Sequence, residues 1–131
     1  MKTLKQQLEK RIKTVDDAYK ETGRPKVDFS VYPEDLRTNR EAEYDAIVIV
    51  EAARKIEREN GFSEIDWGNN NQWKYIPWFI MSPAGCRFGD SYCDSSNTFA
   101  GSGSHLRVLS EEACDYIGKK FLEVWKNVQL K

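Results

Sequence analysis

The chain has 131 residues with 20 basic and 21 acidic side chains, and its formal net charge is -1 at pH 7. This length is enough for one domain that buries an apolar core of its own. Because the charges are so evenly balanced, the chain lacks the positive excess that drives general nucleic-acid binding. A nucleic-acid partner is therefore not expected.

The N-terminal residues 1–21 are charged throughout, and no apolar run approaches the length of a membrane-spanning helix. The cysteines Cys86, Cys93 and Cys114 are odd in number, which argues against a closed disulfide framework. We therefore expect a soluble, cytoplasmic protein that does not contact a membrane.

The first predicted element is an amphipathic helix over residues 1–23. Its apolar stripe recurs at helical spacing and consists of Leu4, Leu8, Ile12, Val15 and Tyr19. Gly23 and Pro25 end the helix, because glycine suits a left-handed cap and proline cannot continue a helix. We place this helix at the periphery of a core formed by residues 39–131.

A second helix is predicted over residues 39–60, after an irregular connector over residues 26–37 whose Pro33 forbids a regular helix through its centre. The stretch AIVIV at residues 46–50 is β-branched and would also suit a strand. The length of the pattern and the Asn60-Gly61 ending favour a helix. The wide apolar arc predicts that it is the most buried helix.

Three short strands are then predicted, over residues 73–80, 86–93 and 105–109. The sequence SPAG at residues 82–85 favours a tight turn between the first two. Pro77 lacks an N–H and so belongs on an edge strand or at a bulge. A last helix begins after Ser110. The expected order is α-α-β-β-β-α, a single α+β domain over residues 1–131 with a small antiparallel meander packed against helices.

Metal or nucleophilic chemistry is weakly supported. Three cysteines and His105 could in principle bind zinc, but their spacing is unlike that of a zinc knuckle and Cys114 falls on an apolar helix stripe. A hydrolytic pair of His105 with Ser104 or Cys93 would lack the strand-turn-helix pattern of a nucleophile elbow. We expect no metal, no cofactor and no catalytic residue.

Arg87 and Arg107 fall on neighbouring predicted strands, where they could contact an anion or simply face solvent. Together with His105 and the glycine-rich residues 101–104, they suggest a small-ligand or nucleotide pocket in which an aromatic ring stacks on a base. This pocket is the alternative to a protein-binding surface.

Aromatic side chains and amides concentrate in GNNNQWKYIPWF, residues 68–79. Alternate strand residues face opposite sides, with Trp73, Tyr75, Pro77 and Phe79 on one and Lys74, Ile76, Trp78 and Ile80 on the other. Both faces are largely apolar, so one can pack on the helices while the second needs a loop, a subunit or a ligand to cover it. The amides at residues 69–72 could cap turns or hydrogen-bond a ligand stacked on Trp73 or Trp78.

Residues 44–130 resemble a family of small uncharacterised proteins found in phages and mobile elements of gut anaerobes. The resemblance rests on DWGNNNQWKYIPWF with its KYxPWF core, a GSxSxL-like step written GSGSHL here, and the closing helix EEACDYIGKKFLEVW. In the family an arginine commonly precedes that leucine, whereas this chain has His105 there and Arg107 two places later. The resemblance implies an accessory role in the cytoplasm of a bacterial host and assigns no activity.

The sequence therefore favours a non-enzymatic binding protein over an enzyme. Its aromatic-rich surface would contact an unidentified host protein, a small molecule or a second copy of the chain in a homo-oligomer. The candidate binding residues are Trp67, Asn70, Asn71, Trp73, Tyr75, Trp78, Arg87, His105 and Arg107.

Overall fold

The computed structural model describes residues 2–69, 71–83, 85–93 and 104–130. Its elements are, in chain order, α1 (Leu4–Arg11), α2 (Val15–Thr22), α3 (Glu34–Glu59), β1 (Tyr75–Ser82), β2 (Gly85–Cys93), the 3-10 turn η1 (Ser104–Leu106), α4 (Glu111–Lys120) and α5 (Leu122–Gln129). The described residues thus form an α+β fold of five α-helices and one two-stranded antiparallel sheet, which confirms the predicted class.

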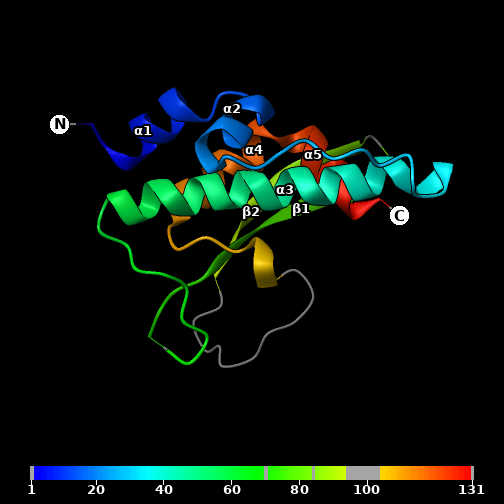
Figure 1. The fold of residues 1–131 in the computed structure, drawn as a ribbon. Coiled ribbons are helices and arrows are strands. Elements are labelled where there is room, and N and C mark those ends of the chain that lie inside the picture. The colour runs from blue at the N-terminus through cyan, green and yellow to red at the C-terminus, as the bar shows by residue number, and fades with distance from the viewer. Residues whose placement is uncertain (1, 70, 84, 94–103, 131) are drawn as a thin grey trace.

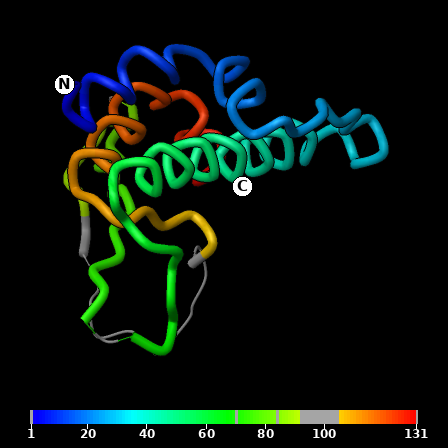
Figure 2. Tube along the Cα trace, turned by 60° about the vertical axis from the view of Figure 1, so that its left-hand side comes forward, coloured from blue at the N-terminus to red at the C-terminus, as the bar shows by residue number. Residues whose placement is uncertain are grey.

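The long helix α3 runs through the middle of the fold (Figure 1). α2 and α5 pack against it, and α1 contacts both α3 and α4. α4 contacts both strands of the hairpin, so α4 and α5 connect the hairpin to α3. Figure 2 shows α1 and α2 along one side of α3, while the loop that follows α3 extends away from the helices.

The single helix predicted over residues 1–23 is wrong in one respect, because it is two helices. The side chain of Thr14 accepts a hydrogen bond from the N–H of Asp17, and the carboxylate of Asp17 accepts one from the N–H of Thr14. This reciprocal cap starts α2 as a new helix. Gly23 ends it in the left-handed conformation (φ 71°), as predicted.

The predicted second helix is confirmed as α3, but it begins earlier than residue 39. Pro33 stands immediately before the first helical residue, where its fixed φ suits the start of a helix instead of breaking one. The β-branched residues 46–50 are helical, and four of these five side chains are fully buried: Ala46, Val48, Ile49 and Val50. Burial on several sides of α3 therefore overrides their preference for strands.

The predicted last helix is divided at Phe121 into α4 and α5. The carbonyl oxygen of Ile117 accepts the N–H of Phe121 at 3.2 Å and the indole N–H of the buried Trp125 at 3.0 Å. Phe121 has non-helical angles (φ -111°, ψ 39°), and α5 restarts from it. The break lets α5 pack along α3 while α4 contacts the hairpin.

The third strand, predicted over residues 105–109, is not formed. Val108 makes one isolated bridge with Tyr75, through N–H to O hydrogen bonds of 2.8 and 2.9 Å. Just before Val108, the guanidinium of Arg54 donates hydrogen bonds to the carbonyl oxygens of Arg107 (2.6 Å) and His105 (3.1 Å). These two carbonyl groups face away from β1, because Val108 directs its own N–H and C=O to Tyr75 and alternate residues point to opposite sides. Arg54 thus ties the segment to α3, while Pro77, two residues after Tyr75, has no N–H with which a ladder could continue.

Strand β1 presents one side to the helices. Phe79 stacks on Trp125 with ring centroids 5.9 Å apart and meets Phe88 of β2 edge-on at 6.1 Å. Pro77 is buried on the same face and pairs with Ser91, next to a register shift between Trp78 and Phe79. Because Tyr75 directs its backbone groups away from β2, Pro77 two residues on lies on the open edge, as its missing N–H predicts.

A buried carboxylate joins α3 to the start of α4. Glu57 is fully buried and accepts hydrogen bonds from the N–H of Leu109 (3.0 Å) and the hydroxyl of Ser110 (2.6 Å). The Ser110 oxygen also accepts the N–H of Ala113 at 3.2 Å and so caps α4. Burial raises the pKa of Glu57, and these hydrogen bonds offset part of that rise.

We predict that Glu57→Gln removes a pH-dependent part of the stability. A carboxyl whose pKa is higher in the folded state stabilises the fold fully below its unfolded pKa of about 4.3, and this contribution is lost as pH rises through the raised value. Wild type should therefore lose stability relative to the variant as pH rises from 4 toward neutrality, measured by urea unfolding. Parallel curves for the two proteins would contradict a raised pKa.

We also predict that Gly118→Ala destabilises the protein although alanine favours helices. A β-carbon there would lie 2.5 Å from Phe88 Cε1 and 3.1 Å from Pro77 Cβ. Overpacking costs about 1–3 kcal/mol, which exceeds or cancels the gain of about 1 kcal/mol in helix propensity. Urea unfolding measures the change, and the loss should shrink in a Phe88→Leu background. An equal loss in both backgrounds would show that Phe88 is not the obstacle.

Candidate functional site

The loop between α3 and β1 is organised around a buried lysine. Lys74 is fully buried, and its ammonium donates to the carbonyl oxygens of Asn69 (3.3 Å) and Gln72 (3.2 Å) while lying 5.2 Å from the ring centre of Trp67. The expectation that Lys74 shares a strand face with Trp78 is therefore wrong, because Lys74 precedes the strand. Trp67 therefore makes a cation–π contact with the Lys74 ammonium.

The amide-rich run closes turns in this loop. Gln72 accepts the N–H of Asp66 (2.7 Å) and donates to the carbonyl oxygen of Glu64 (2.7 Å). The side chain of Asn69 accepts the N–H of Asn71 at 2.9 Å. The amides were predicted either to cap turns or to hydrogen-bond a ligand. In the described residues they form turns. Asn70 lies outside the described residues.

Two tryptophans are exposed, and they lie on different segments. Trp73 was predicted to share the packed face of Pro77 and Phe79. This is wrong, because Trp73 precedes β1 and is 56% exposed. Trp78 lies within β1 and is 58% exposed. Tyr75 lies between them in the chain, is half-buried, and pairs with Val108. The predicted aromatic surface is therefore divided between the loop and the hairpin.

The outer face of the hairpin, opposite to the face that packs on α4 and α5, carries Trp78 and Ile80. Ile80 is 41% exposed and pairs with Arg87 of β2, while Trp78 pairs with Asp90. Paired residues of an antiparallel ladder share a face, so two large apolar side chains lie beside one positive and one negative charge. We call this set of four residues the outer face.

The predicted anion site does not form as expected, because Arg107 is not on a strand beside Arg87. His105 lies in η1 and contacts Glu43 of α3, with 2.8 Å between Nε2 and Oε1. Nε and Nη1 of Arg107 are buried and have no hydrogen-bond partner among the described residues. Residues 101–103 of the glycine-rich loop lie outside the described residues.

Two adjoining cavities follow the open edge of β1. One, of about 400 Å³, is lined by Trp78, Phe79 and Met81, and the other, of about 330 Å³, by Arg40, Glu43 and Trp125. They share Ile76, Pro77 and Gln129. Sequence reasoning missed Arg40 and Glu43, because only the packing of η1 and α5 beside α3 makes them line a cavity.

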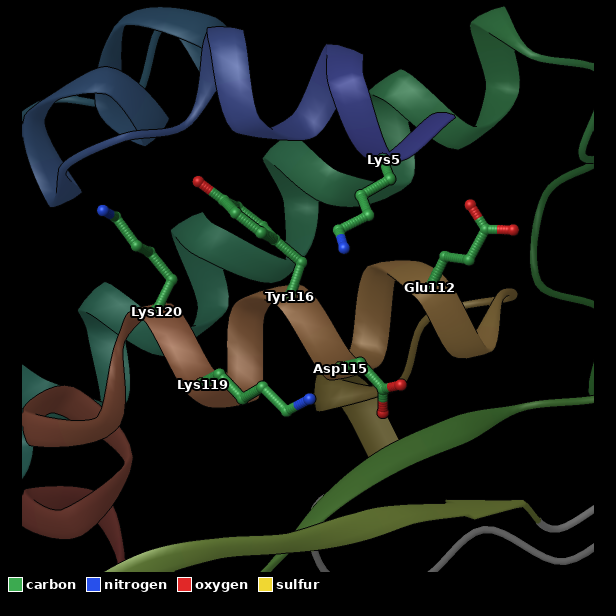
Figure 3. A pocket seen from close by; sticks show the side chains of 6 residues that line it. All are labelled: Lys5, Glu112, Asp115, Tyr116, Lys119 and Lys120. Carbon is green, nitrogen blue, oxygen red and sulfur yellow. The ribbon is translucent and has the colours of Figure 1, made fainter. Parts of the chain in front are cut away.

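A third cavity, of about 470 Å³, lies between α1 and α4 (Figure 3). Its charged side chains follow the dipole of α4, with Glu112 and Asp115 toward the N-terminus and Lys119 and Lys120 toward the C-terminus. The hydroxyl of Tyr116 donates to the carbonyl oxygen of Ile12 at 2.6 Å, linking α4 to the end of α1. These groups are explained by helix stability and interhelical contact.

Comparison with protein-family models, with curated proteins and with solved structures finds no match. Among the described residues, no group of three or more side chains could hold a metal ion, and no helix is long and apolar enough to cross a membrane. Burial raises the pKa of the Cys114 thiol to about 12, so it is held in the protonated, weakly nucleophilic form. The outer face and the cavities at the open edge of β1 are therefore the candidate sites.

We predict that Cys114 resists alkylation in the folded protein. A thiol that is fully buried and has a raised pKa supplies almost no thiolate at pH 8. Treatment with iodoacetamide followed by peptide mass spectrometry should label the half-buried Cys86 first and label Cys114 after denaturation. Equal labelling rates at the two positions in native buffer would contradict the buried environment of Cys114.

Proposed function

We propose that this chain is a non-enzymatic binding protein whose contact surface is the outer face of the hairpin. The observation that carries the proposal is the exposure of Trp78 (58%) and Ile80 (41%) side by side on a strand whose other face is packed. Tryptophan is enriched at the centres of protein interfaces, where its large ring is buried by the partner.

The charges of the outer face favour a second copy of the chain as the partner. Arg87 and Asp90 flank the apolar pair and carry opposite charges. In a face-to-face dimer, a twofold axis midway between them sets Arg87 of one copy against Asp90 of the other, and the two apolar pairs meet between them. The outer face therefore carries both the positive and the negative member of each ion pair that a dimer would form.

The sequence resemblance of residues 44–130 to small proteins of phages and mobile elements supports a place for this binding protein in a mobile genetic element. In that setting the protein is an accessory factor in the cytoplasm of a bacterial host, and it acts by contact without catalysis. A dimer would present two copies of the loop with exposed Trp73 to a host protein.

We predict that the wild-type protein self-associates and that Trp78→Ala abolishes the association without unfolding the protein. Removing a side chain that is 58% exposed takes away interface area while the buried core stays intact. Sedimentation velocity over a hundredfold range of concentration should show a monomer–dimer equilibrium for wild type and a monomer for the variant.

Val31→Ala is the matched control, because Val31 is a large apolar residue that is 84% exposed far from the hairpin in sequence. It should dimerise like wild type. Charge reversal at one position, Arg87→Asp, should weaken the dimer, and the double reversal with Asp90→Arg should restore it. A wild-type protein that stays monomeric throughout, or a Trp78→Ala variant that dimerises normally, would contradict the proposal.

A further inference from the structure

The cavity of about 330 Å³ at the open edge of β1 is lined by both apolar and charged side chains. Its apolar walls come from β1, η1 and α5 and consist of Ile76, Pro77, Leu106, Trp125 and Val128. Its charged residues are Arg40 and Glu43, both from α3. The volume falls in the range of about 300–1,000 Å³ that small-molecule sites occupy.

Arg40 is held in place and still has a free donor. Its Nε and Nη2 donate to Oδ1 of Asn39, at 2.9 and 2.5 Å. Asn39 is itself buried, and its amide donates to the carbonyl oxygens of Asn127 (3.0 Å) and Val128 (3.1 Å) at the end of α5. Nη1 of Arg40 has no hydrogen-bond partner among the described residues, so the guanidinium is pre-positioned to bind a carboxylate.

Glu43 is held in the same manner one helical turn further on. One carboxylate oxygen contacts Nε2 of His105 at 2.8 Å, and the side chain is 23% exposed. Residues three apart on a helix lie close enough to pair, yet no ion pair joins Arg40 and Glu43 in the described part of the chain. Each is held by a different neighbour, so one turn of α3 presents a positive and a negative group to the same cavity.

We infer that this cavity binds a free α-amino acid with an apolar side chain. Its carboxylate would contact Arg40, its ammonium would contact Glu43, and its side chain would enter the space beside Trp125. An acid without an amine would leave Glu43 with His105 alone, and an amine without an acid would leave Nη1 of Arg40 without an acceptor, so each would lose one charge-assisted hydrogen bond. The pair of opposite charges beside apolar walls therefore selects a zwitterion.

The inference is independent of the proposed dimer. The cavity is lined from α3, η1, α5 and the open edge of β1, and none of the four residues of the outer face lines it. A monomeric protein could therefore bind the amino acid, and a dimeric one could fail to bind it.

The test is isothermal titration calorimetry of the full chain with L-leucine and L-phenylalanine. Both should bind at one site. N-acetyl-L-leucine lacks the ammonium, L-leucinamide lacks the carboxylate and glycine lacks the side chain, so each should bind roughly tenfold more weakly or worse.

Variants then locate the site. Arg40→Met and Glu43→Gln should each weaken L-leucine binding by roughly tenfold or more, while Glu41→Gln, on an exposed position of α3 between them, should leave it unchanged. Thermal unfolding without ligand identifies any variant that has simply lost its fold, and Val128→Trp then blocks the cavity by an independent route. Binding of N-acetyl-L-leucine as tightly as L-leucine, or heat from none of the five probes, would overturn the inference.

Discussion

The buried carboxylate of Glu57 is the interaction on which the arrangement of the other elements depends. A carboxylate in the core costs several kcal/mol unless it is hydrogen-bonded, and here the N–H of Leu109 and the hydroxyl of Ser110 supply those bonds. The same Ser110 oxygen caps α4, so one side chain of α3 sets where α4 begins. α4 in turn carries Gly118, against which Phe88 of the hairpin packs. The position of the hairpin therefore depends on Glu57 through α4.

Arg54, three residues earlier on α3, fixes the segment in which a third strand was predicted. Its guanidinium donates hydrogen bonds to the carbonyl oxygens of His105 and Arg107. The segment before α4 is therefore held by a helix side chain and not by a strand ladder. Among the described residues, the hairpin has an open edge beyond the Tyr75–Val108 bridge, and its outer face keeps Trp78 and Ile80 largely exposed. A two-stranded sheet of this kind gains from a partner on its exposed side, because small sheets bury little apolar surface alone.

The two candidate sites use different parts of this arrangement. The outer face offers flat apolar area with balanced charges, which suits a protein surface. The cavity beside Trp125 is lined by a pair of opposite charges and by apolar side chains, which suits a small zwitterion. Arg40 and Glu43 acquire this role because Asn39 and His105 keep them from pairing with each other.

The sequence by itself determined the α+β class, the helical state of residues 39–59, the tight hairpin and the edge position of Pro77, but not that α3 begins at Glu34. These follow from apolar periodicity, from turn residues and from the missing proline N–H, which are local properties of the chain. It also indicated that the second side of β1 would lack a helical cover. What the sequence could not determine was which side chain would compete for which backbone group. Thr14 with Asp17 divides the first helix, the indole of Trp125 binds the carbonyl oxygen of Ile117 at the break before Phe121, and Arg54 holds the segment where the third strand was predicted. The burial of Lys74 and the pairing of His105 with Glu43 likewise join residues that are adjacent only after folding, so only the tertiary structure decided them.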